Sequence, residues 1–340
     1  MRYSIFFFAA DWAAADSADP YRLFRDSAVF ADRNGFETVW VPERHFHPFG
    51  GLYPAPAIMA ASIAGLTQRI QVWAGSVVTP LCDPIRVAEE WAMVDLLSRG
   101  RAGVSFASGW AVNDFALSPE TYDQRREITL SRIETIRRLW RGETIRRRNG
   151  AGVEIDLRIY PLPGRDIPIA LTAQSDATAM KAGELGASLL MNMNYQSVDK
   201  LRSRVEAYRA ELARHHPRRR GHVTVMVHTL LCARERVRDL ALPAYCRYLA
   251  TNLDLQMELF RGAGVELDAV TPEDLAFLIQ RAAVRMMGTV GLIGPPEECR
   301  ERARAYESAG VDEIGCLIDF ATSRETVMES LALAAQHLVE

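Results

Sequence analysis

The sequence predicts an α/β protein built as a single (β/α)8 barrel, also called a TIM barrel, and two observations lead to that fold class. Eight short apolar segments alternate with longer amphipathic segments along the 340 residues, as strands and helices do in such barrels. No Gly-x-Gly-x-x-Gly motif opens a helix after the first strand, so an open, doubly wound sheet lacks its signature. We therefore expect one domain, residues 1–340.

Each expected strand is a short run rich in apolar residues, and the first is apolar at almost every position, as in a parallel strand covered on both faces. The strands are expected at residues 4–9, 38–41, 70–78, 102–107, 169–173, 187–192, 222–232 and 313–320. Helices with one apolar face are expected at about 20–35, 56–66, 84–96, 123–141, 297–309 and 322–338. Asp19 and Asp83 are the expected N-caps of the first and third helices.

Two segments do not fit the simple alternation of strand and helix. Residues 142–164 contain Asn149-Gly150 between two alternating stretches, which predicts a β-hairpin insertion. Residues 234–286 have helical character and no strand, and they are too long for one crossover. We expect a helical insertion there, after the seventh strand.

Composition narrows the class of protein. The chain is 49% hydrophobic and 24% charged with a net charge of −3, which is typical of a globular protein and argues against nucleic acid or an anionic membrane as the main partner. The five cysteines are widely spaced and form no Cys-x-x-Cys, so reduced thiols and a cytoplasmic location are expected. The apolar run near the amino terminus is too short to span a membrane.

The residues that follow the expected strands indicate the kind of site. In a barrel these positions meet at one end, where the chemistry takes place. Here they include PERHFHPFGG (42–51), SGWAVNDF (108–115) and AQSDAT (173–178), which are rich in aromatic, amide and small residues. Converging carboxylates are scarce, so a pocket for a flat organic cofactor is favoured over a hydrolytic acid pair.

A metal centre is the alternative for the paired histidines. His45 and His47 lie one residue apart, as in zinc-dependent hydrolases of this fold, but such sites need ligands from later strands. Only His228 and Asp319 are placed to join them, so we expect no metal.

The segment AQSDAT reads as a strand that runs into a helix. Backbone N–H groups at the helix start, with the hydroxyls of Ser175 and Thr178, could hold a phosphate, although an ordinary N-cap explains the same residues. Asp176 would repel a phosphate, so its side chain is expected to face away.

Over nearly its full length the chain resembles the bacterial luciferase-like flavin monooxygenases. The matching segments are GFETVWVPERHF, AGSVVTPLCDPIRVAEEWAMVDLLSRGR, SFASGWAVNDF and GLIGPPEECRERARAYESAGVDEIGCLIDF, and they look closest to the branch of natural-product biosynthesis. The resemblance implies a barrel that binds reduced FMN delivered by a separate flavin reductase. It also implies that oxygen adds to C4a of the flavin and that the resulting peroxide oxidises a small or carrier-tethered substrate.

Site residues follow from the resemblance by position. It implies that Gly75-Ser76, at a position that is often a cis peptide, packs on the isoalloxazine. His45 is the expected catalytic polar group, because a histidine exchanges a proton near neutral pH, although a loop histidine with satisfied hydrogen bonds explains the same residue. Arg44 would pair with Glu43 or meet an anionic substrate. The remaining residues implied are Ser108 and Trp110 beside the flavin, Gln174, Ser175 and Thr178 at the ribityl and phosphate groups, and His228 as a further catalytic group.

The departures from the family pattern leave alternatives open. Arg44 replaces the first of two adjacent histidines, and Ala111 stands where the branch carries a polar residue. An F420-dependent oxidoreductase of the same fold and a non-catalytic flavin-binding subunit are the competing functions. The resemblance also implies a homodimer through the helices that carry IMAASIAGL and VAEEWAMVDLL.

Overall fold

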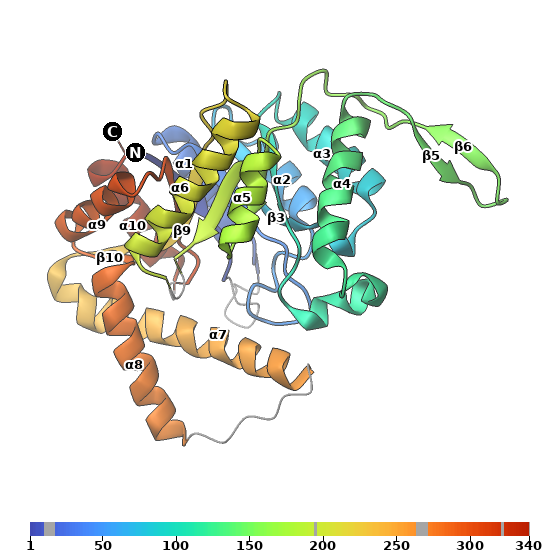
Figure 1. The fold of residues 1–340 in the computed structure, drawn as a ribbon. Helices are drawn as coiled ribbons and strands as arrows, with labels where there is room; N and C mark the ends of the chain where they lie inside the picture. Colours follow the sequence, from blue (N-terminus) through green and yellow to red (C-terminus); the bar gives the residue numbers. More distant parts are fainter. Residues whose placement is uncertain (10–17, 194–195, 263–270, 321–322, 340) are drawn as a thin grey trace.

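A closed barrel of parallel strands forms the body of the protein in this computed structural model, as the sequence predicts (Figure 1). The structure describes residues 1–9, 18–193, 196–262, 271–320 and 323–339. The barrel strands are β1 (Arg2–Phe6), β2 (Thr38–Val41), β3 (Gln71–Val78), β4 (Ala102–Ala107), β7 (Ile169–Thr172), β8 (Ser188–Asn192), β9 (Val223–Leu231) and β11 (Glu313–Leu317). Each strand pairs with its neighbours in this order, and β11 closes the barrel against β1.

Helices surround the barrel, and their starts follow local sequence signals. They are α1 (Arg22–Arg33), α2 (Pro56–Ala64), α3 (Pro84–Leu97), α4 (Arg125–Trp140), α5 (Asp176–Glu184), α6 (Val198–His215), α9 (Pro296–Ser308) and α10 (Arg324–His337). Asp83 caps α3 as predicted, since its carboxylate accepts a hydrogen bond of 2.8 Å from the Ile85 N–H. The predicted cap of α1 is wrong: Asp19 pairs with Arg25, and the helix begins at Arg22.

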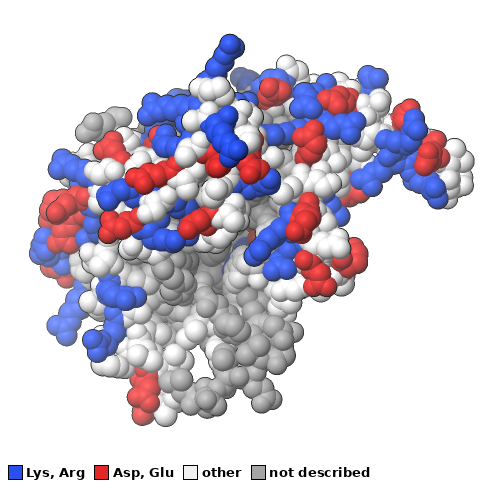
Figure 2. All heavy atoms as spheres, in the orientation of Figure 1, with Lys and Arg blue, Asp and Glu red and all other residues white. Residues whose placement is uncertain are grey.

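The outer surface of α5, α6 and α9 is polar and of mixed charge. Figure 2 shows Lys and Arg intermingled with Asp and Glu over α5, α6 and α9. Because positive and negative side chains alternate, this face has no large area of a single charge, which agrees with the small net charge of −3. Among the described residues, no helix combines the length and the hydrophobicity needed to cross a membrane.

Two insertions leave the barrel. β5 (Ile145–Arg148) and β6 (Glu154–Leu157) pair antiparallel as a hairpin that projects away from the body (Figure 1), and Asn149 Oδ1 accepts from the Ala151 and Val153 N–H groups in its turn. After β9 come α7 (Leu242–Gly262) and α8 (Pro272–Thr289).

A short strand at the end of the second insertion was not predicted from the sequence. β10 (Leu292–Gly294) pairs parallel with the last residues of β9, Thr229–Leu231. It has only three residues, and they show no periodicity that could separate a strand from a loop.

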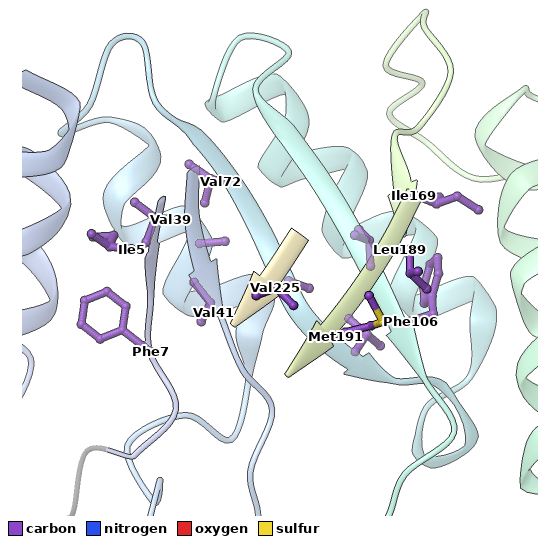
Figure 3. Packing of buried hydrophobic residues seen from close by; sticks show 14 of the residues in the cluster. Ile5, Phe7, Val39, Val41, Val72, Phe106, Ile169, Leu189, Met191 and Val225 are labelled. Atoms are coloured by element: carbon purple, nitrogen blue, oxygen red, sulfur yellow. The ribbon is translucent and has the colours of Figure 1, made fainter. Parts of the chain in front are cut away.

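Side chains alternate between the two faces of each strand and form two apolar layers. Ile5, Val39 and Val72 belong to the outer layer, which packs beneath the helices (Figure 3). Phe6 and Trp40 belong to the inner layer, which fills the barrel and continues to α7. A strand that is covered on both faces must be apolar at successive positions, which explains the continuous apolar runs in the sequence.

Large rings fill the barrel interior where opposing residues are small. The ring centroids of Trp40 and Trp73 lie 5.1 Å apart, and those of Phe6 and Trp40 lie 5.8 Å apart. Gly103 provides the space, because a Cβ atom there would lie 2.1 Å from Cε2 of Trp73. This packing closes the interior below the carboxyl ends of the strands.

Candidate active site

A cavity of about 280 Å³ opens at the carboxyl ends of the barrel strands, where enzymes of this fold hold their substrates. Its wall comes from several strands and from α7. The lining residues are Phe6, Phe8, Pro42, Glu43, Arg44, Gly75, Ser76, Val78, Ala107, Gly109, Trp110, Thr172, Gln174, Leu190, Met191, Asn192, Met226 and Asn252. An apolar wall with a few hydroxyl and amide groups suits a largely flat organic molecule.

The wall at the end of β3 contains an unusual piece of backbone. The peptide bond between Gly75 and Ser76 is cis, as the family resemblance implied. Ser76 Oγ donates to Ser105 Oγ at 3.3 Å and also contacts Thr172 Oγ1. Ser105 and Thr172 are themselves 2.8 Å apart, so three hydroxyls from β3, β4 and β7 form one network beside the cavity.

Glu43 links the ends of β2 and β3. Its carboxylate accepts a 2.7 Å hydrogen bond from the Val78 N–H and lies 3.1 Å from Nε2 of His45. The expected pairing of Glu43 with Arg44 is therefore wrong, because His45 takes that place. The residue is buried, with 8% of its surface exposed, and its charge is compensated by these two partners.

His45 faces Glu43 and is not among the residues that line the cavity. Burial lowers the pKa of its imidazole, but the hydrogen bond and the charge of Glu43 outweigh burial and raise the pKa above its usual value. The pair can hold a proton between Nε2 and the carboxylate at the edge of the cavity. His47 accepts a hydrogen bond from the Phe49 N–H at 3.1 Å, within the same loop.

Arg44 lines the cavity from within a ring of aromatic side chains. Its Cζ atom lies 4.5 Å from the ring centroid of Phe8 and 5.2 Å from those of Phe49 and Trp110. Only 6% of the residue is exposed, and burial lowers its pKa to about 10, so the guanidinium remains charged at neutral pH. Nη2 has no hydrogen-bond partner within the described parts of the chain.

His228 lies inside the barrel beneath α7 and does not line the cavity. Its ring makes edge-on contacts with Tyr245 and Tyr248 of α7 and with Phe320, at centroid distances of 5.0, 4.5 and 5.7 Å. Burial lowers its pKa to about 3, so the imidazole is neutral. Its Nδ1 is 3.5 Å from the Tyr245 hydroxyl.

The start of α5 has the features expected of an anion site. Ser175 is the N-cap, and its hydroxyl accepts from the Thr178 N–H at 3.2 Å. The side chain of Asp176 faces away, as predicted, and its carboxylate contacts Lys200 and Arg204, each at 2.9 Å. The sequence did not predict Lys200 and Arg204 as partners of Asp176, because both belong to α6. Folding brings α6 beside α5.

The other predicted residues divide into two groups. Trp110 and Gln174 line the cavity, whereas Ser108, Ser175 and Thr178 are not among its lining residues. The sequence reasoning missed many of the lining residues, among them Phe6, Phe8, Thr172, Leu190, Met226 and Asn252. Alternation along β1 could have identified the two phenylalanines, since every second side chain of a barrel strand points inward.

The candidate metal ligands have other partners. Asp319 accepts from the N–H groups of Phe8 and Ala9 and from the hydroxyl of Tyr53. Within the described ranges, no group of three or more His, Cys, Asp or Glu side chains is arranged to hold a metal ion.

A closed barrel of parallel strands with a cavity at their carboxyl ends defines the class of the protein, a (β/α)8 barrel with the architecture of a TIM-barrel enzyme. A family model described as luciferase-like monooxygenase matches residues 1–313. The chain therefore belongs to the luciferase-like monooxygenase family.

Relatives in this family use two kinds of cofactor. The flavin-dependent trigonelline monooxygenase, oxygenase component, of Acinetobacter baylyi is 24% identical over 88% of this chain and 84% of its own length. The F420-dependent glucose-6-phosphate dehydrogenase of Amycolatopsis mediterranei is 31% identical over 51% of this chain. The chain spans about half the length of that relative, 54%.

Solved structures share the fold at low identity. The monooxygenase RslO1 from Streptomyces bottropensis superposes with a TM-score of 0.83 and 20% identity, over 99% of this chain and 98% of its own. The oxygenating constituent of 3,6-diketocamphane monooxygenase from Pseudomonas putida, in complex with FMN, gives a TM-score of 0.78 and 16% identity, over 100% and 98%. At these identities the similarity establishes the fold alone.

Proposed function

We propose that the protein is a flavin-dependent monooxygenase that uses reduced FMN and O2 to oxidise a small organic or carrier-tethered intermediate of natural-product biosynthesis. The observation that carries the proposal is the cavity wall at the end of β3, where the hydroxyls of Ser76, Ser105 and Thr172 form a network beside an otherwise largely apolar lining. Family membership supports it, as does the flavin-dependent relative that aligns with most of the chain. A separate flavin reductase would supply the reduced cofactor.

The residues present fit such a cofactor. Gly75, Ser76, Leu190 and Met226 are the residues that would hold the planar ring, and Ser175 at the start of α5 would hold the phosphate. Reduced FMN, when bound, supplies the two electrons that let one oxygen atom enter the substrate while the other leaves as water.

The protein's own groups would control protons and water. Glu43 and His45 hold a proton at Nε2 beside the cavity, where it is available for transfer. Asn252 of α7 lines the cavity together with strand residues, so this helix covers part of the mouth and limits the access of water.

Binding of reduced FMN without oxygen tests the proposal. We expect saturable binding in anaerobic titrations, with weaker binding of oxidised FMN. Ser175→Asp should weaken the binding of reduced FMN by roughly tenfold, because a carboxylate at the helix start repels the phosphate. Ser175→Asn is the matched control, since asparagine also caps helices but carries no charge. Equal affinities of the Asp and Asn variants would contradict the phosphate site.

F420-dependent hydride transfer is the second candidate, and the 31% identical dehydrogenase is the observation that favours it. The two reactions differ in their need for oxygen. A monooxygenase forms product only with O2 and a source of reduced flavin, whereas an F420-dependent enzyme reduces its cofactor under anaerobic conditions. Anaerobic reduction of F420 by a substrate would replace the first proposal with the second.

A further inference from the structure

The guanidinium of Arg44 is buried beside the cavity, and within the described residues the charges of Asp114 and Asp319 act on it without a hydrogen bond to its Nη2. The guanidinium lies against Phe8, Phe49 and Trp110, and Nη2 has no hydrogen-bond partner in the described parts of the chain. Aromatic faces attract a cation but offer it no acceptor atom. A buried charge without a hydrogen-bonded partner destabilises a protein strongly, so this position is suited to an anion that comes from outside.

The carboxylates of the site are already engaged. Glu43 accepts from Val78 and His45, and Asp319 accepts from two backbone N–H groups after β1 and from a tyrosine hydroxyl. Asp114, in the loop after β4, interacts with Arg44 only through its charge. Burial raises the pKa of Asp114 to about 6, although His45 and Arg44 act in the opposite direction.

We infer that Arg44 binds a carboxylate of the substrate through Nη2, so that the cavity selects anionic organic molecules. This inference rests on the proposed function, because it names the substrate class for the same cavity. A planar guanidinium suits a carboxylate, since two parallel N–H groups can meet both oxygens. The aromatic rings around Arg44 would hold the guanidinium in place and would contact an apolar part of the substrate.

The cofactor phosphate is a less suitable partner for Arg44. The phosphate is assigned to the start of α5, which follows β7, whereas Arg44 follows β2. Strands β3 and β4 lie between these two strands in the barrel. A phosphate at Ser175 would therefore not also supply a hydrogen-bond acceptor to Nη2 of Arg44.

Benzoate and benzamide form a matched pair of probes, since they differ mainly in charge. Calorimetric titration of the full chain without flavin should show benzoate binding at least about tenfold more tightly than benzamide. Arg44→Met should abolish this preference and keep the fold, because an apolar side chain of similar length replaces the charge among the rings. Arg125→Met is the matched control: Arg125 also lies over an aromatic ring, 4.4 Å from Tyr122, but outside the cavity.

Equal binding of the two probes by the native chain would overturn the inference, as would a benzoate preference that survives Arg44→Met. If the methionine variant does not fold, Arg44→Lys takes its place. Lysine keeps the charge but lacks the planar fork, so benzoate binding should weaken at least about threefold. Unchanged benzoate affinity in the lysine variant would also overturn the inference.

A titration in the presence of saturating FMN separates the substrate from the cofactor. Benzoate should still bind with the same preference when FMN is present. Displacement of benzoate by FMN, together with weaker FMN binding in Arg44→Met, would assign Arg44 to the cofactor phosphate and overturn the inference. Failure of reduced FMN to bind would instead refute the proposed function and leave the benzoate preference as it is.

Discussion

At the scale of single residues, the pairing of His45 with Glu43 sets the protonation of the imidazole. The hydrogen bond and charge of Glu43 outweigh the effect of burial, so the pKa of His45 is raised above 6.5. A histidine whose pKa is raised by folding stabilises the native state while it is protonated. That contribution is complete below about pH 6.5, the pKa of an unfolded histidine, and is lost as the pH rises through the raised value.

We therefore predict that His45→Gln lowers the free energy of unfolding most at acidic pH. The expected loss is about 1 kcal/mol near pH 5.5, because a charge-assisted hydrogen bond is removed from a partly buried site. The difference should shrink as the pH rises towards 9. Urea unfolding of both proteins across this range measures it. A difference that stays constant with pH would contradict a protonated His45 in the native state.

At the scale of elements, the barrel depends on glycines that face large rings across neighbouring strands. β3 and β4 are in register so that Trp73 pairs with Gly103, and the indole occupies the space that a side chain on β4 would fill. Interiors packed to crystal-like density tolerate little added volume. The register of these two strands and the position of Trp73 therefore depend on a residue without a Cβ atom.

Gly103→Ala should destabilise the protein by about 2 kcal/mol, because the new methyl group overlaps the ring of Trp73. Gly150→Ala at the tip of the hairpin is the matched control, since no atom lies within 4 Å of a Cβ at that position. The control should change stability by less than about 0.5 kcal/mol. Urea unfolding compares the two variants, and equal effects would argue against a tightly filled barrel interior.

At the scale of the whole molecule, apolar side chains gather on one side of the barrel. On and just after α2, Ile58 and Leu66 are 71% and 50% exposed, and on α3 Met93 and Leu97 are 54% and 56% exposed. The two helices lie next to each other and carry the segments through which the resemblance implies a dimer. Exposed apolar side chains on two adjacent helices are typical of a surface that binds another protein.

We propose that this surface joins two copies of the chain. Light scattering should give twice the chain mass of 38.0 kDa, and combined Ile58→Glu and Met93→Glu changes should give the mass of one chain. Phe277→Glu on α8 is the control, because Phe277 is 57% exposed but lies on another part of the molecule. A native mass near 38.0 kDa would refute the dimer.

The sequence by itself determined the alternation of strands and helices, the N-caps at Asp83 and Ser175 and the turn at Asn149, because these features depend on residues close together in the chain. Only the tertiary structure decided which groups meet at the cavity. Glu43 bonds to Val78 rather than to its neighbour Arg44 because β2 lies beside β3, and Asn252 reaches the cavity because α7 folds back towards the mouth. The aromatic surroundings of the Arg44 guanidinium likewise depend on tertiary structure. Phe8 follows β1 and Trp110 follows β4, and only closure of the barrel brings them together at Arg44.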